Sequence, residues 1–189
     1  GLMLRYRDGD VAAFEQLYQR HKDALYRYLM RMCHDREVAN DLFQEVWGKV
    51  IASRERYEPR AQFNTFLFHI AHNCAVDHFR RADRQRADRM QDVTELEETL
   101  VGADSERPDA RLTQMQMRDA LLAALRQLPV EQRNVFVLYE ESGLSLEEIG
   151  KLTGVAMETA KSRLRYAVNK LRSALHPHQA GPLERGVKP

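Results

Sequence analysis

Residues 143–164, GLSLEEIGKLTGVAMETAKSRL, decide the fold of the C-terminal part of the chain. Ser145 stands three residues before Glu148, which is the spacing of a capping box and starts a short helix over residues 146–152. Gly154 ends that helix after about two turns, and a longer helix is expected from Met157 onward. A short helix, a glycine turn and a longer helix form the helix-turn-helix pattern, whose second helix enters the DNA major groove.

A helical wheel at about 100° per residue supports this interpretation of the second helix. Ala160, Leu164, Ala167 and Leu171 fall within one buried stripe, and polar or basic side chains occupy the rest of the circumference. A solvated basic face would look the same on an isolated helix, but the capped short helix ahead of it favours DNA binding. The candidate DNA-reading residues are Glu158, Thr159, Lys161, Ser162, Arg163, Arg165 and Tyr166.

The rest of the chain also shows helical periodicity, and no segment alternates like a strand. We expect an all-α protein of two small helical domains, residues 1–91 and 112–175, joined by a flexible acidic linker over 92–111 and followed by a flexible tail over 176–189. The stretch 82–112 holds nine acidic and five basic residues, so the net charge of +1 is a cancellation between this stretch and two modestly basic domains. No segment approaches the roughly 20 apolar residues of a membrane span, and we expect a cytoplasmic protein without membrane insertion.

Two helices are expected in the N-terminal domain. Asp35 can cap a helix whose polar face carries Asp41, Gln44 and Glu45. This face suits docking on a basic partner helix, although a solvated face would have the same composition.

The next helix, over residues 63–81, has apolar residues on both sides. One side carries Phe66, Leu67, Ile70, Ala71 and Cys74, and the other carries Phe68, His69, His72, Val76 and Phe79. Either neighbouring helices sandwich this helix, or its rings form a stacking platform for unpaired bases beside the arginines that follow. The spacing leaves both interpretations open.

A metal or redox site is the enzymatic alternative, because Cys33, His34, His78 and the His69, His72 and Cys74 group could supply ligands. Cys74 lies on the buried stripe, however, while His69 and His72 project from the other side. We therefore expect no catalytic residue, no metal and no cofactor.

Taken together, these segments resemble bacterial RNA polymerase sigma factors. Residues 41–47 (DLFQEVW), 63–67 (FNTFL), 70–73 (IAHN), Asp77 and Arg80–Arg81 resemble sigma region 2, and residues 125–133, 143–150 and 159–164 resemble sigma region 4. Their order and spacing match over about residues 8–175. Two domains joined by a short linker resemble the extracytoplasmic-function (ECF, group 4) sigma factors.

The resemblance implies a non-enzymatic factor that directs promoter-specific initiation by binding core polymerase, recognising the −35 and −10 elements and assisting melting. Its expected partners are core RNA polymerase (β′ clamp helices and β flap), promoter DNA and an anti-sigma factor, with a monomer when free. A stand-alone helix-turn-helix regulator is the alternative, but it does not explain the sequence of residues 63–81.

The resemblance also assigns residues. Asp41, Gln44, Glu45 and Trp47 would bind core polymerase. The helix-turn-helix residues named above would bind the −35 element, and Gly150 replaces a usual alanine at a cost of about 0.5–1 kcal/mol in helix propensity. The −10 strand would be held by Arg60, Phe63, Asn64, Thr65, Phe66, His69, His72, Asn73, Asp77, Arg80 and Arg81.

Overall fold

A computed structural model describes residues 1–59, 61–90 and 110–179. Residue 60, the linker at 91–109 and residues 180–189 lie outside the described part. The all-α prediction is confirmed, since the described residues contain helices and no strand. The helices are α1 (Leu2–Arg7), α2 (Val11–Cys33), α3 (Arg36–Ala52), the short 3-10 helix η1 (Arg54–Arg56), α4 (Phe63–Met90), α5 (Ala110–Arg126), α6 (Val130–Ser142), α7 (Leu146–Thr153) and α8 (Met157–Gln179).

Side-chain caps start several of these helices, including α3, where the sequence predicted one at Asp35. The Asp35 carboxylate accepts hydrogen bonds from the backbone N–H groups of Glu37 and Val38, at 2.8 and 3.1 Å. Asp10 caps α2 in the same way, accepting from the N–H of Ala13 at 3.1 Å. Such caps satisfy backbone donors that have no partner inside the helix.

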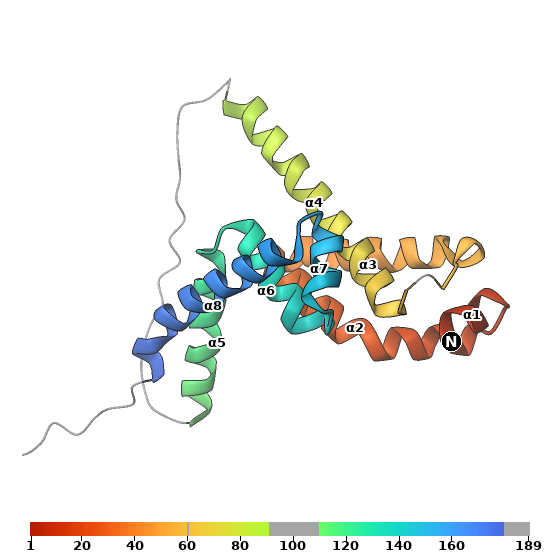
Figure 1. The fold of residues 1–189 in the computed structure, drawn as a ribbon, viewed down its shortest axis with the longest axis horizontal. Coiled ribbons are helices and arrows are strands. Elements are labelled where there is room, and N and C mark those ends of the chain that lie inside the picture. Colours follow the sequence, from red (N-terminus) through yellow and green to blue (C-terminus); the bar gives the residue numbers. More distant parts are fainter. Residues whose placement is uncertain (60, 91–109, 180–189) are drawn as a thin grey trace, which may run out of the picture.

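The helices form two bundles, which we call the N-terminal bundle (α1–α4) and the C-terminal bundle (α5–α8) (Figure 1). In the N-terminal bundle α2, α3 and α4 pack on one another around buried residues such as Leu29, Val46 and Leu67. In the C-terminal bundle α8 packs against α5, α6 and α7, around Leu125 and Ile149. The bundles also contact each other, because α6 packs along α2 and both α6 and α7 touch α4.

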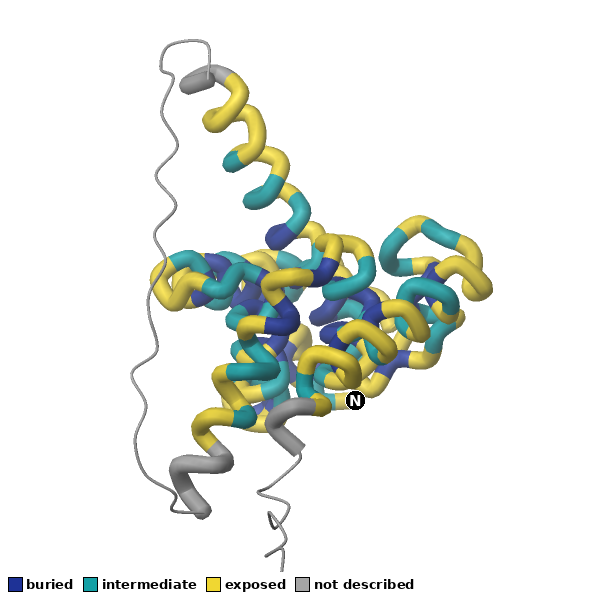
Figure 2. The backbone as a smooth tube through the Cα atoms, turned by 90° about the vertical axis from the view of Figure 1, so that its left-hand side faces the viewer, coloured by how far each residue is buried: buried dark blue, intermediate teal, exposed yellow. Residues whose placement is uncertain are grey.

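Three helix boundaries differ from the expectations. α4 continues past Arg81 to Met90, and Figures 1 and 2 show its last part projecting from the body with exposed residues. The sequence there is rich in alanine and arginine, which favour a helix without tertiary support. α5 begins at Ala110, inside the expected linker, and α8 reaches Gln179, inside the expected tail.

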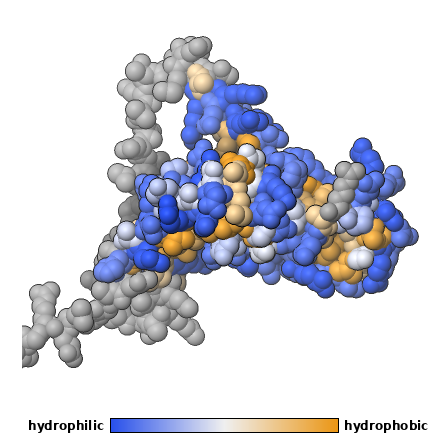
Figure 3. Space-filling model, viewed as in Figure 1, coloured by the Kyte–Doolittle hydropathy of each residue, from blue (hydrophilic) through white to orange (hydrophobic). Residues whose placement is uncertain are grey.

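The surface is mostly polar. Hydrophilic residues cover most of the face in Figure 3, and hydrophobic residues form small separate areas on it. Within the described residues, no helix combines the length and the hydropathy that crossing a membrane requires.

Candidate polymerase and nucleic-acid interfaces

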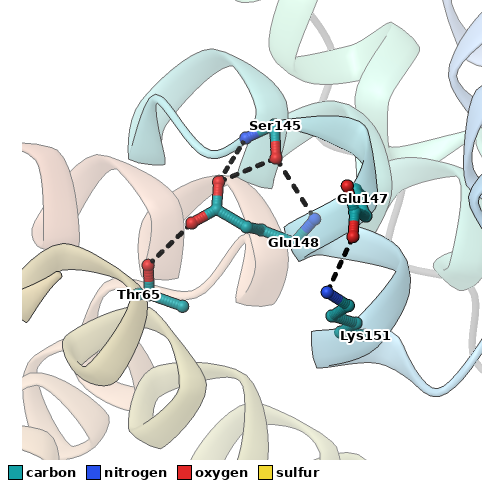
Figure 4. Close-up of polar contacts among 5 residues, drawn as sticks. All are labelled: Thr65, Ser145, Glu147, Glu148 and Lys151. Carbon is teal, nitrogen blue, oxygen red and sulfur yellow. Dashed lines mark hydrogen bonds and ion pairs between the residues drawn. The ribbon is translucent and has the colours of Figure 1, made fainter. Parts of the chain in front are cut away.

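The capping box of α7 is present as predicted. The Glu148 backbone N–H donates to Ser145 Oγ at 3.3 Å, and the Glu148 carboxylate accepts from the Ser145 N–H at 2.9 Å and from its hydroxyl at 2.8 Å (Figure 4). The hydrogen bonds from Ser145 lower the pKa of the Glu148 carboxyl, and the one from the Ser145 backbone N–H has the largest effect. Glu147 points away and pairs with Lys151 at 2.7 Å. The short helix is therefore fixed at its first turn.

The turn between α7 and α8 depends on two glycines. Gly154 has a φ of +71°, in the left-handed region that favours glycine. Gly150 accepts a hydrogen bond from the Val155 N–H at 2.9 Å, and a Cβ atom on Gly150 would lie 2.9 Å from the Val155 carbonyl oxygen. The expectation that Gly150 costs only helix propensity is thus incomplete, since the close approach of this turn requires a residue without a side chain.

α8 presents the polar face that the helical wheel predicted. Ala160 and Ala167 are fully buried against the bundle. The Arg165 guanidinium lies over the exposed Tyr166 ring, 5.5 Å from its centroid. Of the seven candidates, Ser162 and Arg163 are half-buried, and the exposed ones are Glu158, Thr159, Lys161, Arg165 and Tyr166.

The polar face of α3 is only partly available to a partner. Asp41 and Gln44 are exposed, whereas Glu45 is half-buried and pairs with Lys49 at 2.8 Å, a contact that lowers the pKa of Glu45. Trp47 is 5% exposed and packs against aromatic rings of α2 and α3, namely Phe14, Tyr18 and Phe43. The Trp47 indole thus faces the core and holds α3 in place in this arrangement, and its contact with polymerase stays a prediction.

A groove of about 350 Å³ runs between α3 and α4 beside this face. It brings Asp41 and Glu45 together with Arg81, which the sequence assigned to the −10 strand. Sequence reasoning missed His78 and Gln85 here, because only the packing of α4 on α3 brings them to this groove. Its full lining is Val38, Asp41, Leu42, Glu45, His78, Arg81, Ala82 and Gln85.

An open pocket of about 630 Å³ lies where the η1–α4 loop meets the start of α4. Its wall contains Tyr57, which is buried and meets the Phe66 ring edge-on at 5.1 Å. Sequence reasoning missed Ser53, Arg56 and Tyr57, although an aromatic residue two positions before Pro59 was a usable signal. Arg60 lies outside the described residues. The pocket is lined by Ser53, Arg56, Tyr57, Glu58, Ala61, Thr65, Phe66 and His69.

The other predicted −10 residues spread along α4. Phe63 packs against the His21 ring at 5.2 Å. His69 and Asn73 are exposed and adjacent, with Asn73 Nδ2 3.4 Å from His69 Nδ1. Asp77, Arg80 and Arg81 are exposed further along the helix, where the Arg81 side chain donates to the Asp77 carbonyl oxygen at 3.2 Å.

Neighbouring helices sandwich α4, so packing explains part of its unusual apolar content. Phe68 is fully buried and meets the Tyr28 ring edge-on at 5.6 Å. Asn64, Thr65 and His72, by contrast, are half-buried and contact the C-terminal bundle. Burial therefore removes Phe68 from a stacking platform, whereas stacking of a base on Phe66, at the wall of the pocket, stays a prediction.

The cysteines and histidines do not form a metal centre in the described part of the chain, where no group of three or more His, Cys, Asp or Glu residues could share an ion. Cys74 is buried beside Lys49, with Sγ 3.3 Å from Nζ, and burial raises its pKa. Cys33 is half-buried at the end of α2.

Comparison with known proteins agrees with this division into two bundles. Residues 17–85 match the family model for sigma-70 region 2, and residues 118–171 match that for sigma-70 region 4. The chain is 37% identical to RNA polymerase sigma factor CarQ of Myxococcus xanthus, over 92% of this chain and 95% of that protein. It is 33% identical to ECF RNA polymerase sigma factor RpoE of Cereibacter sphaeroides, over 90% and 91% of the two chains.

A solved structure has a similar fold. The sigma factor RpoE from Bartonella quintana, in complex with the anti-sigma factor NepR, superposes with a TM-score of 0.68 at 25% sequence identity, covering 88% of this chain and 98% of that one.

Proposed function

Because the chain belongs to the RNA polymerase sigma factor family, we propose that it is a promoter-specificity subunit that binds core polymerase, recognises −35 and −10 elements and assists melting. The observation that carries this proposal is the presence of two separate reading surfaces in one chain. A capped helix-turn-helix presents an exposed basic helix, and an aromatic-walled pocket opens at the start of α4. The names of the relatives support assignment to the ECF group, group 4 in the finer classification.

The −35 element is the ligand we assign to α8. Its exposed face offers Arg165 for base edges and Lys161 for phosphates, with the half-buried Arg163 at its border, the arrangement by which a recognition helix reads a major groove. The HTH turn holds this face away from the core, because Ala160 and Ala167 anchor the opposite side.

The −10 element is the ligand we assign to the pocket and α4. Pockets of a few hundred Å³ with aromatic walls hold planar ligands, and single-stranded bases gain about 1–3 kcal/mol each by stacking on aromatic rings. A flipped base would enter the pocket beside Phe66 and Tyr57, where His69 lies at the rim. Arg80, exposed further along α4, would hold the backbone of the same strand.

Core polymerase would dock on the α3 face through Asp41, Gln44 and the groove between α3 and α4, and on the C-terminal bundle through its β flap. An anti-sigma factor would hold the protein inactive, which the similar fold of a sigma factor solved with its anti-sigma factor supports. The protein would have no catalytic activity of its own and would act in the cytoplasm, where polymerase and promoter DNA meet.

Run-off transcription with purified core polymerase tests this function. Core enzyme alone should give no discrete transcript from a library of genomic fragments, and adding the protein should give transcripts from a few of them. The Arg165→Ala variant should lose these transcripts while keeping its helical circular dichroism. If no fragment is transcribed, yet the protein alone binds duplex DNA tightly, a stand-alone regulator replaces the sigma-factor proposal.

A further inference from the structure

Polar side chains assigned to the −10 strand are already engaged by the C-terminal bundle. The Asn64 amide donates to the Ser142 carbonyl oxygen. The Thr65 hydroxyl donates to the Glu148 carboxylate at 3.1 Å, as Figure 4 shows. His72 Nδ1 lies 3.0 Å from the Asn134 amide nitrogen. The side chains that would bond to the DNA strand are thus the ones that α6 and α7 already contact.

A buried relay fixes the position of α6 on the N-terminal bundle. The Tyr28 hydroxyl donates to Asn134 Oδ1 at 3.0 Å, while the amide group of Asn134 faces His72. Tyr28 is fully buried and Asn134 is 7% exposed, so both would lose protein partners if the bundles separated. Because buried polar groups need matched hydrogen-bond partners, this relay specifies one position of α6 on the N-terminal bundle and not a non-specific association.

An ion-pair cluster closes the other side of the same contact. The Glu141 carboxylate of α6 lies 2.7 Å from the Arg27 guanidinium and 2.5 Å from the Arg31 guanidinium of α2. The Glu141 side chain is 5% exposed, so water screens these pairs less than it screens surface pairs. One carboxylate thus bridges two cations of α2 and offsets part of the repulsion between them.

The contact between the two bundles does not cover the proposed −35 and −10 surfaces equally. Thr159, Lys161 and Arg165 of the recognition helix stay exposed, as do Asp77 and Arg80 on the far part of α4. The engaged part of α4 runs from Asn64 to His72, beside the pocket that the strand would enter.

We propose that the free chain inhibits itself: the C-terminal bundle competes with single-stranded −10 DNA for Asn64, Thr65 and His72, and the Tyr28–Asn134–His72 relay and the Glu141 ion pairs hold it there. This inference rests on the proposed −10 role of α4. The closed chain keeps its −35 face available, and separation of the bundles releases the −10 face.

Glu141→Arg tests the proposal, with Glu140→Arg as its matched control. Both variants change the charge by the same amount on neighbouring positions of α6, but Glu140 is exposed whereas Glu141 lies between two arginines. Small-angle X-ray scattering of the full chain should give a larger radius of gyration for Glu141→Arg only. A second variant, carrying Arg27→Glu and Arg31→Glu together with Glu141→Arg, should restore the compact form.

Fluorescence anisotropy then measures the affinity for a pool of random 12-nucleotide single strands and for the same pool as duplex. The Glu141→Arg variant should bind single strands about fivefold more tightly than the Glu140→Arg variant, as expected if about four-fifths of the wild-type chain is closed. The two variants should bind duplex equally. If Glu141→Arg has a larger radius of gyration but an unchanged affinity for single strands, the C-terminal bundle does not compete with the strand. If the wild-type chain has the same radius of gyration as this variant, the free chain is not closed.

Run-off transcription separates this inference from the proposed function. With saturating core polymerase, Glu141→Arg should support the same transcripts as wild type. Absence of transcripts from both would reject the sigma-factor function, whereas the scattering comparison decides closure without reference to transcription.

Discussion

The same substitution, glycine to alanine, should have opposite effects at Gly48 and Gly150. Both residues lie inside helices, where alanine is favoured over glycine by about 0.5–1 kcal/mol. An added Cβ at Gly48 meets nothing within 4 Å. Gly48→Ala should therefore raise the free energy of unfolding of the N-terminal bundle by about 0.5–1 kcal/mol.

At Gly150 the added Cβ lies 2.9 Å from the Val155 carbonyl oxygen and 3.4 Å from the Met157 Cα, and both are backbone atoms that cannot rotate away. Overpacking of this kind costs about 1–3 kcal/mol. After subtracting the helix-propensity gain of about 0.5–1 kcal/mol, Gly150→Ala should lower the stability of the C-terminal bundle by about 1 kcal/mol and loosen the turn that carries α8.

Urea unfolding followed by two probes separates the two bundles. Trp47 is the single tryptophan and lies in the N-terminal bundle, so its fluorescence reports that bundle, while far-UV circular dichroism reports both. Gly48→Ala should raise the fluorescence midpoint by about 0.5 M at a typical slope of 1–3 kcal/mol per molar urea. Gly150→Ala should lower the midpoint seen by circular dichroism. If Gly150→Ala is as stable as wild type, the steric argument for this turn is wrong.

Further perturbations test the surfaces and the closed arrangement. Asp41→Arg should weaken core-polymerase binding at least severalfold with an unchanged circular dichroism spectrum. If pull-down titration gives the same affinity for variant and wild type, the docking face is not on α3. Arg165→Ala should weaken −35 duplex binding by about 1–3 kcal/mol and leave single-strand binding unchanged in anisotropy assays. Asp35→Ala should lower the thermal midpoint of the N-terminal bundle, because two capping hydrogen bonds worth about 1 kcal/mol are lost. Burial and the nearby Arg133 lower the pKa of His34 from 6.5 to about 4. Between these two pH values, His34 binds a proton more readily when the bundles are apart than when they are closed. The closed form should therefore lose stability as the pH falls from 6.5 towards 4. Scattering at pH 7.5 and 5.5 measures this, and His34→Gln should reduce the dependence.

Much of the fold could be predicted from signals that lie within one or two helical turns of the sequence. Ser145, Glu148 and Gly154 predicted α7 and its turn, and Asp35 predicted the start of α3, because capping depends on residues within one turn of the chain. The buried stripe of α8 followed from the wheel for the same reason.

Contacts between distant helices could not be predicted in this way. Trp47 carried a family signature that suggested a docking residue, but the rings that bury it come from α2, far away in the sequence. Asn134 gave no signal at all, since a polar residue on α6 becomes a relay only when Tyr28 and His72 lie on either side of it. The clash at Gly150 depends likewise on the path of the chain after Gly154.

The exposed cations of α8 set an upper limit on what the closed chain can do alone. The exposed cations in the described part of α8, Lys161, Arg165, Lys170 and Arg172, could neutralise about four phosphates at most, which gives a salt dependence of roughly the 3.6th power and weak binding at physiological ionic strength. The −10 face would add stacking energy, but only after the hydrogen bonds of Asn64 and Thr65 to the C-terminal bundle are broken. Weak duplex binding and a covered strand-binding face therefore act in the same direction. If both proposals hold, tight promoter binding would require a partner that holds the two bundles apart, and core polymerase docked on the proposed α3 face would be that partner.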